Sequence, residues 1–321
     1  MKRSYSGYLY IVLCAVIFST MEVMLKTVHG VFAPMQITCL RFLIGGLLLV
    51  PFALRSMKKK GAAFTRADVG FFALTGFLCV AFSMVLYQMA VTYTKASVVA
   101  IIFSCNPIFV TMLAYFLLRE EIHRNHLIAL ALELLAVLII IDPLHASLDP
   151  TGALLAIASA LVFSFYSVVG KKRTPRFGGI AVTCFSFLFG SVIIFCFILI
   201  THIPAVAGFF QSIGLPSFAQ IPILEGYTLQ NLPYVLYVSA GVAGVGFCAY
   251  FLAMEYQPAS VVSLVYFFKP ALSPILAWMV HGEEIPGNML AGILLILAGS
   301  FANIIPGILE IRRAKQQMPS N

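Results

Sequence analysis

Four charged side chains interrupt long apolar stretches of the sequence: Glu22, Arg41, Glu133 and Lys269. A charge inside hydrocarbon is costly, so such residues usually face a cavity, contact a ligand or pair with one another. Among them, a carboxylate could bind a cationic group or carry a proton, and a lysine could bind the carboxylate of a solute. Structural ion pairs between neighbouring helices are the alternative interpretation.

Glu22 and Arg41 are expected at similar depths in adjacent helices. With a rise of about 1.5 Å per residue, Glu22 lies about 22 Å from one membrane edge, counted from Gly7, and Arg41 about 10 Å from the other, counted from Pro34. In hydrocarbon about 30 Å thick these depths nearly coincide. Either Glu22 binds a cationic group or a coupling proton while Arg41 tunes its pKa, or the two form a structural ion pair. The structural interpretation is favoured for Arg41.

Lys269 and Asn106 stand directly before prolines, about ten residues into their expected spans. Ten helical residues rise about 15 Å, which places both side chains near the bilayer midplane. Pro107 and Pro270 each remove a backbone donor and can free carbonyl groups of the preceding turn, so both are structural hinge candidates. Lys269 could bind a substrate carboxylate, pair with Glu22 or serve as a permanent counterion.

Further polar groups accompany these charges. Tyr266, Lys269 and Ser273 follow an i, i+3, i+7 spacing and therefore share one helix face, which we expect to contact substrate. Tyr87 and Tyr250 lie near the ends of their spans, where an aromatic belt at the membrane interface is the simpler interpretation. The substrate-binding candidates are thus Glu22, Lys269, Asn106, Tyr266, Ser273 and Arg41.

The whole chain must supply helices that hold these residues in a membrane. Of its 321 residues, 61% are apolar and 10% charged, with a mean hydropathy of +1.00. Apolar stretches of about 20 residues, the length of a membrane-crossing helix, recur along it. An all-α integral membrane protein with ten transmembrane helices is expected. The predicted spans are 7–25, 34–54, 69–90, 96–118, 125–141, 152–169, 180–201, 233–254, 259–280 and 288–308.

The basic residues orient these spans. With a cytoplasmic amino terminus, 16 of the 20 Lys and Arg residues fall on the inner side, the other four being Lys26, Lys95, Arg41 and Lys269. This bias predicts a multi-pass protein of the plasma or inner cell membrane with both termini cytoplasmic, and it explains the formal charge of +8 without nucleic acid. Residues 202–232 carry no Lys or Arg and several prolines, so they are expected to form an external loop with, at most, an interfacial segment.

An internal repeat organises the chain. The segment 96–122 aligns without gaps to 259–285, at an offset of 163, with ten of 27 positions identical, and TCLRFLIG from Thr38 aligns to TCFSFLFG from Thr183 at an offset of 145. The expected units are residues 1–142, residues 143–309 with the long loop, and a basic cytoplasmic tail at 310–321. Because each copy holds five spans, an odd number, the second copy must be inverted in the membrane, the architecture that alternating access uses.

The sequence resembles the EamA family of the drug/metabolite transporter superfamily over nearly its whole length. The resemblance rests on repeated patterns: Phe18-Ser19 and Phe163-Ser164, Arg41-Phe42, and Ala-Ser-Val-Val followed by Pro107 or Pro270 and by Glu120-Glu121 or Glu283-Glu284. It implies ten helices around a central cavity, with the fifth and tenth helices packed away from the pathway. Glu133, in the fifth, is then expected in a helix-packing or dimer contact.

The sequence favours a secondary transporter for a small organic metabolite, amino acid or drug-like solute, with proton coupling left open. The alternative is a membrane-embedded enzyme or receptor without flux. No nucleotide-binding loop, HExxH or GxSxG motif occurs, so no catalytic residue, metal site or cofactor is expected. All seven cysteines lie in apolar stretches and are read as small packing residues. The expected partners are the solute and the lipid bilayer, and the chain could be a monomer or a homodimer.

Overall fold

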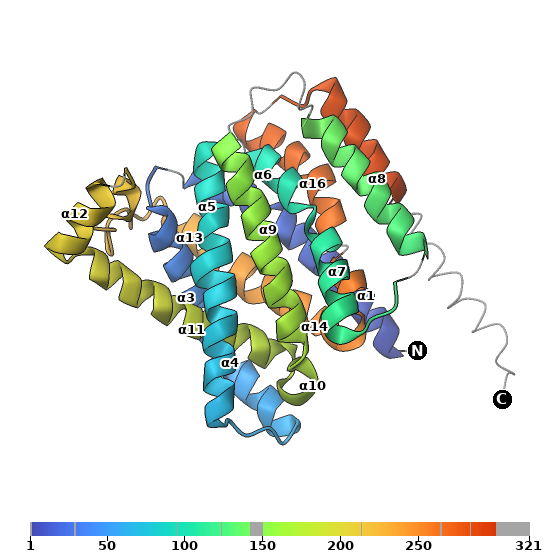
Figure 1. Ribbon diagram of the computed structural model, residues 1–321, viewed down its shortest axis with the longest axis horizontal. Coiled ribbons are helices and arrows are strands. Elements are labelled where there is room, and N and C mark those ends of the chain that lie inside the picture. Colours follow the sequence, from blue (N-terminus) through green and yellow to red (C-terminus); the bar gives the residue numbers. More distant parts are fainter. Residues whose placement is uncertain are drawn as a thin grey trace, which may run out of the picture.

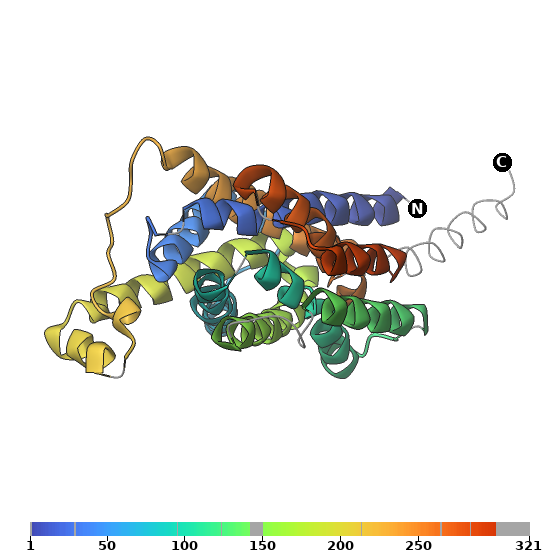
Figure 2. The ribbon, with the colours of Figure 1, turned by 90° about the horizontal axis from the view of Figure 1, so that it is seen from above.

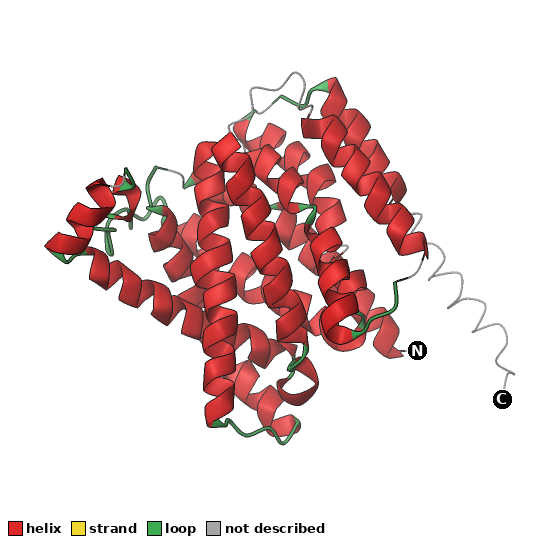
Figure 3. Cartoon of the chain, in the orientation of Figure 1, coloured by secondary structure: helices red, strands yellow, loops and turns green. Residues whose placement is uncertain are grey.

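A computed structural model describes residues 2–299, except 29, 95, 123, 142–149, 213, 264 and 283. All regular structure in this described part is helical (Figure 3). Helices satisfy their own backbone hydrogen bonds, which a segment surrounded by lipid requires. Within the described residues, seven helical segments are long and apolar enough to cross a membrane: Ser6–Thr27, Pro34–Lys59, Arg66–Tyr93, Val98–Leu118, Pro150–Lys171, Gly179–Thr201 and Leu232–Tyr256. The chain therefore has the character of a multi-pass membrane protein.

Several of these spans are interrupted. The first half contains α1 (Lys2–Ser19), α2 (Met21–Thr27), α3 (Pro34–Lys59), α4 (Arg66–Gly76), the π-helical η1 (Phe77–Ser83), α5 (Met84–Tyr93), α6 (Ala96–Phe103), α7 (Asn106–Leu118) and α8 (Arg124–Ile141). The second contains α9 (Pro150–Lys171), α10 (Thr174–Phe177), α11 (Gly179–Thr201), α12 (Pro204–Ser212), η2 (Pro216–Phe218), α13 (Leu232–Leu236), the π-helical η3 (Tyr237–Gly246), α14 (Phe247–Tyr256), α15 (Ala259–Ser263), α16 (Val265–His281) and a final helix, Gly287–Gly299.

The helices fall close to the predicted spans. α8, α16 and Gly287–Gly299 lie on the fifth, ninth and tenth of these spans, and the tenth prediction extends beyond the described residues. α8 and Gly287–Gly299 lie side by side at one edge of the bundle (Figures 1 and 2). They share a small apolar cluster of their own, which includes Leu130, Ala136, Met289 and Ile293. The large core cluster lies among the other helices.

Positions related by the sequence repeat make matching helix contacts. Gly45 of α3 packs against η3 so closely that an added Cβ would lie 2.9 Å from the carbonyl oxygen of Ser239. Gly190 of α11, 145 residues later, packs where α4 meets η1: an added Cβ would lie 2.5 Å from the carbonyl oxygen of Gly76 in α4 and 2.6 Å from Cβ of Val80 in η1. Ser239 in turn follows Gly76 by 163 residues. The two halves thus contact each other twice in the same way, and each contact needs a residue without a side chain.

The two π-helical segments also correspond. η1 ends at Ser83 and η3 at Gly246, which are 163 residues apart. π-helical turns are rare and occur often at functional sites, because the extra residue re-aims the side chains that follow. In this chain α5 follows η1 and α14 follows η3, so both helices enter the core after an equivalent irregularity.

The stretch 202–232 projects at one end of the bundle (Figure 1). It contains α12 and η2 and returns to α3, where Gln36 Nε2 donates hydrogen bonds to the carbonyl oxygens of Glu225 at 2.8 Å and Ile223 at 3.4 Å. The expected external location of this loop stays a prediction.

Candidate functional site

The centre of the site is an ion pair between Glu22 of α2 and Lys269 of α16. The same carboxylate oxygen of Glu22 also accepts a hydrogen bond from the hydroxyl of Tyr87 of α5. All three side chains are fully buried. Elements from both halves therefore meet at one carboxylate, in a part of the molecule where desolvated charges persist only with partners.

A local break in the first span brings Glu22 to this place. α1 ends at Ser19 and α2 begins at Met21. Between them, the hydroxyl of Thr20 donates to the carbonyl oxygen of Ile17 at 2.7 Å and contacts the hydroxyl of Tyr237 of η3 at 2.7 Å. A side chain that bonds its own backbone competes with the helical ladder and tends to bend it. Glu22 follows directly after this bend.

Three aromatic rings surround the ammonium group of Lys269. Its Nζ lies 5.2 Å from the centroid of Phe103, 5.5 Å from that of Tyr87 and 5.7 Å from that of Tyr266. Rings at such distances attract a cation through the negative charge of their faces. The lysine is thus held by one carboxylate and three aromatic faces, and Tyr266 shares its helix face, as the spacing predicted.

Arg41 is buried in a different way. It is fully enclosed, yet within the described part of the chain none of its three guanidinium nitrogens has a hydrogen-bond partner. Its Cζ lies 4.8 Å from the ring centroid of the adjacent Phe42. The structural ion pair expected between Glu22 and Arg41 is absent among the described residues: Lys269 contacts Oε1 of Glu22, and the other carboxylate oxygen, Oε2, has no hydrogen-bond partner among them. The guanidinium of Arg41 is therefore a buried charge with neither a hydrogen bond nor an ion pair among the described residues.

The other candidates are placed nearby but differ in how well they are satisfied. Asn106 Nδ2 donates to Ser164 Oγ at 2.7 Å and to the carbonyl oxygen of Ala160 at 3.1 Å, whereas its Oδ1 has no partner among described residues. Ser273 Oγ is buried and likewise lacks a partner there. Asn106 is therefore held mainly by α9, and the hydroxyl of Ser273 has no hydrogen-bond partner within the described part of the chain.

The hinge candidates differ between the halves. Pro107 is the second residue of α7 and follows a non-helical turn at Ser104 and Cys105. Pro270 lies within α16, and its side chain is outside the described part of the chain, as is that of Glu133.

The prediction of an interface belt for Tyr87 and Tyr250 is wrong. Both rings are fully buried, and each hydroxyl group donates a hydrogen bond to a buried partner. Tyr87 donates to Glu22, and Tyr250 donates to Ser167 Oγ at 3.2 Å. Ser167 follows Glu22 by 145 residues and Tyr250 follows Tyr87 by 163, so the second half holds a neutral copy of the same contact.

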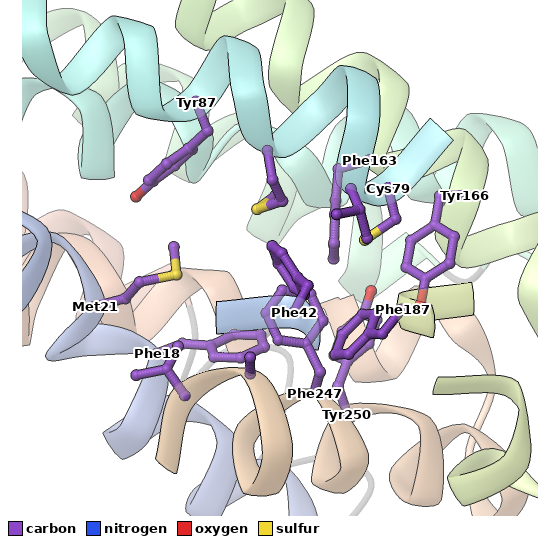
Figure 4. Packing of buried hydrophobic residues seen from close by; sticks show 14 of the residues in the cluster. Phe18, Met21, Phe42, Cys79, Tyr87, Phe163, Tyr166, Phe187, Phe247 and Tyr250 are labelled. Carbon is purple, nitrogen blue, oxygen red and sulfur yellow. The ribbon is translucent and has the colours of Figure 1, made fainter. Parts of the chain in front are cut away.

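An aromatic cluster packs beside the charged residues. Ring centroids are 4.5 Å apart for Phe42 and Phe187, 4.8 Å for Phe18 and Phe247, and 5.1 Å for Phe187 and Phe247. Figure 4 shows this cluster opposite Tyr87, which projects from another helix. The charged groups are therefore bordered by rings that can contact the apolar part of an organic solute.

Glu120 forms a polar contact between the two halves. Its carboxylate accepts hydrogen bonds from Lys171 Nζ at 2.8 Å, from the backbone N–H groups of Ala259 at 2.9 Å and Ser260 at 3.2 Å, and from Ser260 Oγ at 2.9 Å. Burial favours a higher pKa for Glu120, but the ammonium group of Lys171 and these hydrogen bonds outweigh it and hold the pKa below its usual value. The ionised carboxylate thus joins the end of the first half to the second half.

A second ion pair lies near this contact. Lys60 Nζ lies 3.2 Å from Glu255 Oε2, and Glu255 Oε1 accepts a hydrogen bond from the backbone of Gly179. A pocket of about 430 Å³ lies at the same end and is lined partly by Lys60, Glu120, Lys171 and Glu255. Sequence reasoning gave these residues no site role, although the repeated Glu-Glu-Ile pattern that contains Glu120 was recognised.

Known proteins match the chain over nearly its whole length. A model of the EamA-like transporter family matches residues 5–142 and 150–305. A protein of Clostridium kluyveri named "Uncharacterized transporter" is 35% identical over 305 residues, covering 92% of each chain. The "Uncharacterized transporter YetK" of Bacillus subtilis is 26% identical, covering 83% of this chain and 77% of that protein. One crystal structure matches with a TM-score of 0.70 and 17% identity, over 94% of this chain and 98% of that one, a likeness of fold alone.

Proposed function

We propose that this chain, which belongs to the EamA-like transporter family, is a secondary transporter that moves a small organic metabolite, amino acid or drug-like solute by alternating access. The buried Glu22, Arg41 and Lys269 carry the proposal. Charged side chains deep in membrane spans usually mark the pathway of a solute or ion. Here they come from both halves, so relative motion of the halves would change their surroundings.

The proposed architecture is ten helices in two inverted five-helix repeats, at residues 1–142 and 143–309. The matching contacts of Gly45 with η3 and of Gly190 with η1 support it, since an inverted pair can exchange the two arrangements at little cost in energy. Both termini would then lie in the cytoplasm, as the distribution of Lys and Arg favours. Tags at the two ends should be equally accessible from the cytoplasmic side of the cell membrane, and opposite accessibility would overturn the arrangement.

Alternating access needs a closure on each side of the site. The contact of Glu120 with Lys171 would close the cytoplasmic side in the conformation described. The repeat relates Glu120 to Glu283, at an offset of 163, and Lys171 to Lys26, at an offset of 145. Inversion therefore makes Lys26 and Glu283 the corresponding pair on the opposite side of the site.

Paired cysteines can test these two closures. The variant Glu120→Cys/Lys171→Cys should cross-link in one conformation and Lys26→Cys/Glu283→Cys in the other, so that locking either pair blocks exchange and reduction restores it. Equal cross-linking of both pairs under every condition, with exchange intact, would contradict the scheme.

Flux through liposomes that contain only the purified protein tests the function. Radiolabelled amino acids, organic acids and amines are loaded inside, and exchange with the same external solutes is measured. At least one solute should exchange faster than in empty liposomes, and Glu22→Gln should slow that exchange strongly. Glu284→Gln is the matched control, because that glutamate is exposed. Binding or turnover of a solute without flux would instead indicate a receptor or an enzyme.

Proton coupling through Glu22 is part of the proposal and has its own test. A pH gradient should drive uphill accumulation in the unmodified protein. Glu22→Gln should not accumulate solute, even when residual exchange is detectable.

A further inference from the structure

We propose that the buried charged cluster binds the carboxylate group of an organic monoanion, and that Arg41 is the residue that pairs with it. This proposal names the class of solute that the charged site binds. It rests on the proposed transport function, in which binding precedes transport of that solute. The site consists of Glu22, Lys269 and Arg41, with the rings of Phe42 and its neighbours beside them.

The charge of the cluster is the first step. The formal charges are one negative unit on Glu22 and one positive unit on each of Lys269 and Arg41, which sum to one positive unit. Lys269 already faces the only carboxylate of the cluster, whereas Arg41 has no hydrogen-bond partner among the described residues. Arginine keeps its proton under all ordinary conditions, so it cannot relieve the burial by becoming neutral. A bound anion removes this imbalance.

The internal repeat supplies a built-in comparison. The position 145 residues after Arg41 is Ser186, which is also fully buried but exchanges a hydrogen bond with Thr75 at 2.8 Å. Lys269 likewise corresponds to Asn106, and Glu22 to Ser167. The same places in the fold are therefore filled by neutral, hydrogen-bonded side chains in the other half. Helix packing therefore does not require a guanidinium at position 41. Binding of a ligand would explain why an arginine stands there.

The chemistry of the free group selects the class of ligand. A guanidinium presents parallel N–H donors that match the two oxygens of a carboxylate. A single unpaired cation matches a monoanion, whereas an amine would add positive charge beside Lys269 and Arg41. A zwitterion leaves the net positive charge unchanged. The adjacent rings of Phe42, Phe187 and Phe247 suit an apolar body on the bound acid.

Thermal stability of the purified protein in detergent measures this preference. The probes are the monocarboxylates from propionate to octanoate and phenylacetate, each beside its neutral amide, its matching primary amine and its ω-amino acid, at neutral pH. At least one carboxylate should raise Tm by mass action, and its amide, amine and amino acid should not.

Variants locate the effect at Arg41. For the best carboxylate, Arg41→Gln should weaken the apparent Kd by about thirty-fold or more, because a buried partner of the ligand charge is lost. Arg41→Lys should bind with intermediate affinity, since it keeps the charge but not the paired donors, and it provides a second variant if the glutamine variant is unstable. Arg55→Gln removes an exposed charge at the end of α3 and should bind like the parent protein.

The outcomes separate this inference from the transport proposal. The inference is overturned if no carboxylate stabilises the protein more than its amide, amine or amino acid, or if Arg41→Gln binds the carboxylate as tightly as the parent. Flux of a neutral or cationic solute, combined with either result, would leave transport standing. Carboxylate binding that depends on Arg41, without exchange in liposomes, would support the inference and reject transport.

Discussion

The net positive charge of the buried cluster predicts an order of stability for three single substitutions in the absence of solute. Glu22→Gln changes the net charge from one to two positive units, because it leaves Lys269 and Arg41 without an anion. Lys269→Met brings the net charge to zero but removes the partner of Glu22. Arg41→Gln also brings it to zero and removes a group that has no hydrogen-bond partner among the described residues. We expect Arg41→Gln to be the most stable of the three variants, Lys269→Met to be intermediate and Glu22→Gln to be the least stable.

The magnitudes follow from the burial of the groups, since Glu22 and Lys269 are both fully enclosed. Removal of one member of a buried ion pair typically costs about 3–5 kcal/mol, because the other charge stays desolvated. Lys269→Met should fall at the lower end, since Glu22 keeps the hydrogen bond from Tyr87. Glu22→Gln should fall at the upper end. The free energy of unfolding of Arg41→Gln should equal that of the parent protein or exceed it by up to about 2 kcal/mol, because an unpaired buried charge is removed.

Equilibrium unfolding in mixed micelles with increasing dodecyl sulfate gives the free energies. The control is Lys60→Met, which breaks an ion pair whose side chains are 29% and 17% exposed and should cost at most about 1 kcal/mol. If Arg41→Gln destabilises the protein as much as Glu22→Gln does, Arg41 is a structural partner in the core. The charge count, and the inference of an anionic solute drawn from it, would then be refuted.

Five other substitutions test three separate features of the structure. Tyr87→Phe removes a donor to a carboxylate and should cost about 1.5–3 kcal/mol in unfolding free energy, whereas Tyr250→Phe removes a bond between neutral groups and should cost about 0.5–1.5 kcal/mol. Gly190→Ala forces two helix backbones apart and should cost about 1–3 kcal/mol, while Gly70→Ala, where an added Cβ meets nothing within 4 Å, should stabilise by about 0.5–1 kcal/mol. The low pKa of Glu120 gives a stability contribution that is complete above its unfolded pKa and is lost as the pH falls through the folded pKa; Glu120→Gln should flatten that acid limb in thermal melts.

The sequence predicted where the helices lie, because their positions follow from hydrophobic length, and the helical rise supplied an expected depth for each charged residue. Glu22 and Lys269 were recognised as candidate partners for this reason. Which residue faces which could not be derived from depth alone. The preference for a Glu22 contact with Arg41 failed because partner choice depends on how the helices are rotated and on the bend at Thr20, which no period in the sequence encodes.

The misplacement of Tyr87 and Tyr250 has a related cause. Each lies close to the end of an apolar stretch, and an end in sequence was equated with a membrane interface. The spans Arg66–Tyr93 and Leu232–Tyr256 are 28 and 25 residues long and contain π-helical turns, so residues near their ends can still lie in the packed interior. Whether a residue near the end of a span is buried therefore depends on the length and irregularity of the helix, and not on hydropathy alone.

Duplication and divergence have separate effects in this molecule. The contacts that join the halves, at Gly45 and Gly190, are nearly the same in both copies. In the proposed inverted architecture, such contacts would allow two arrangements of similar energy. The charged residues break that symmetry, since Glu22, Arg41 and Lys269 each correspond to a neutral residue that satisfies the same place in the fold. The helix contacts on which the proposed motion depends therefore do not involve the charged residues. Their identity can set which solute binds without altering the helix contacts on which the proposed motion depends.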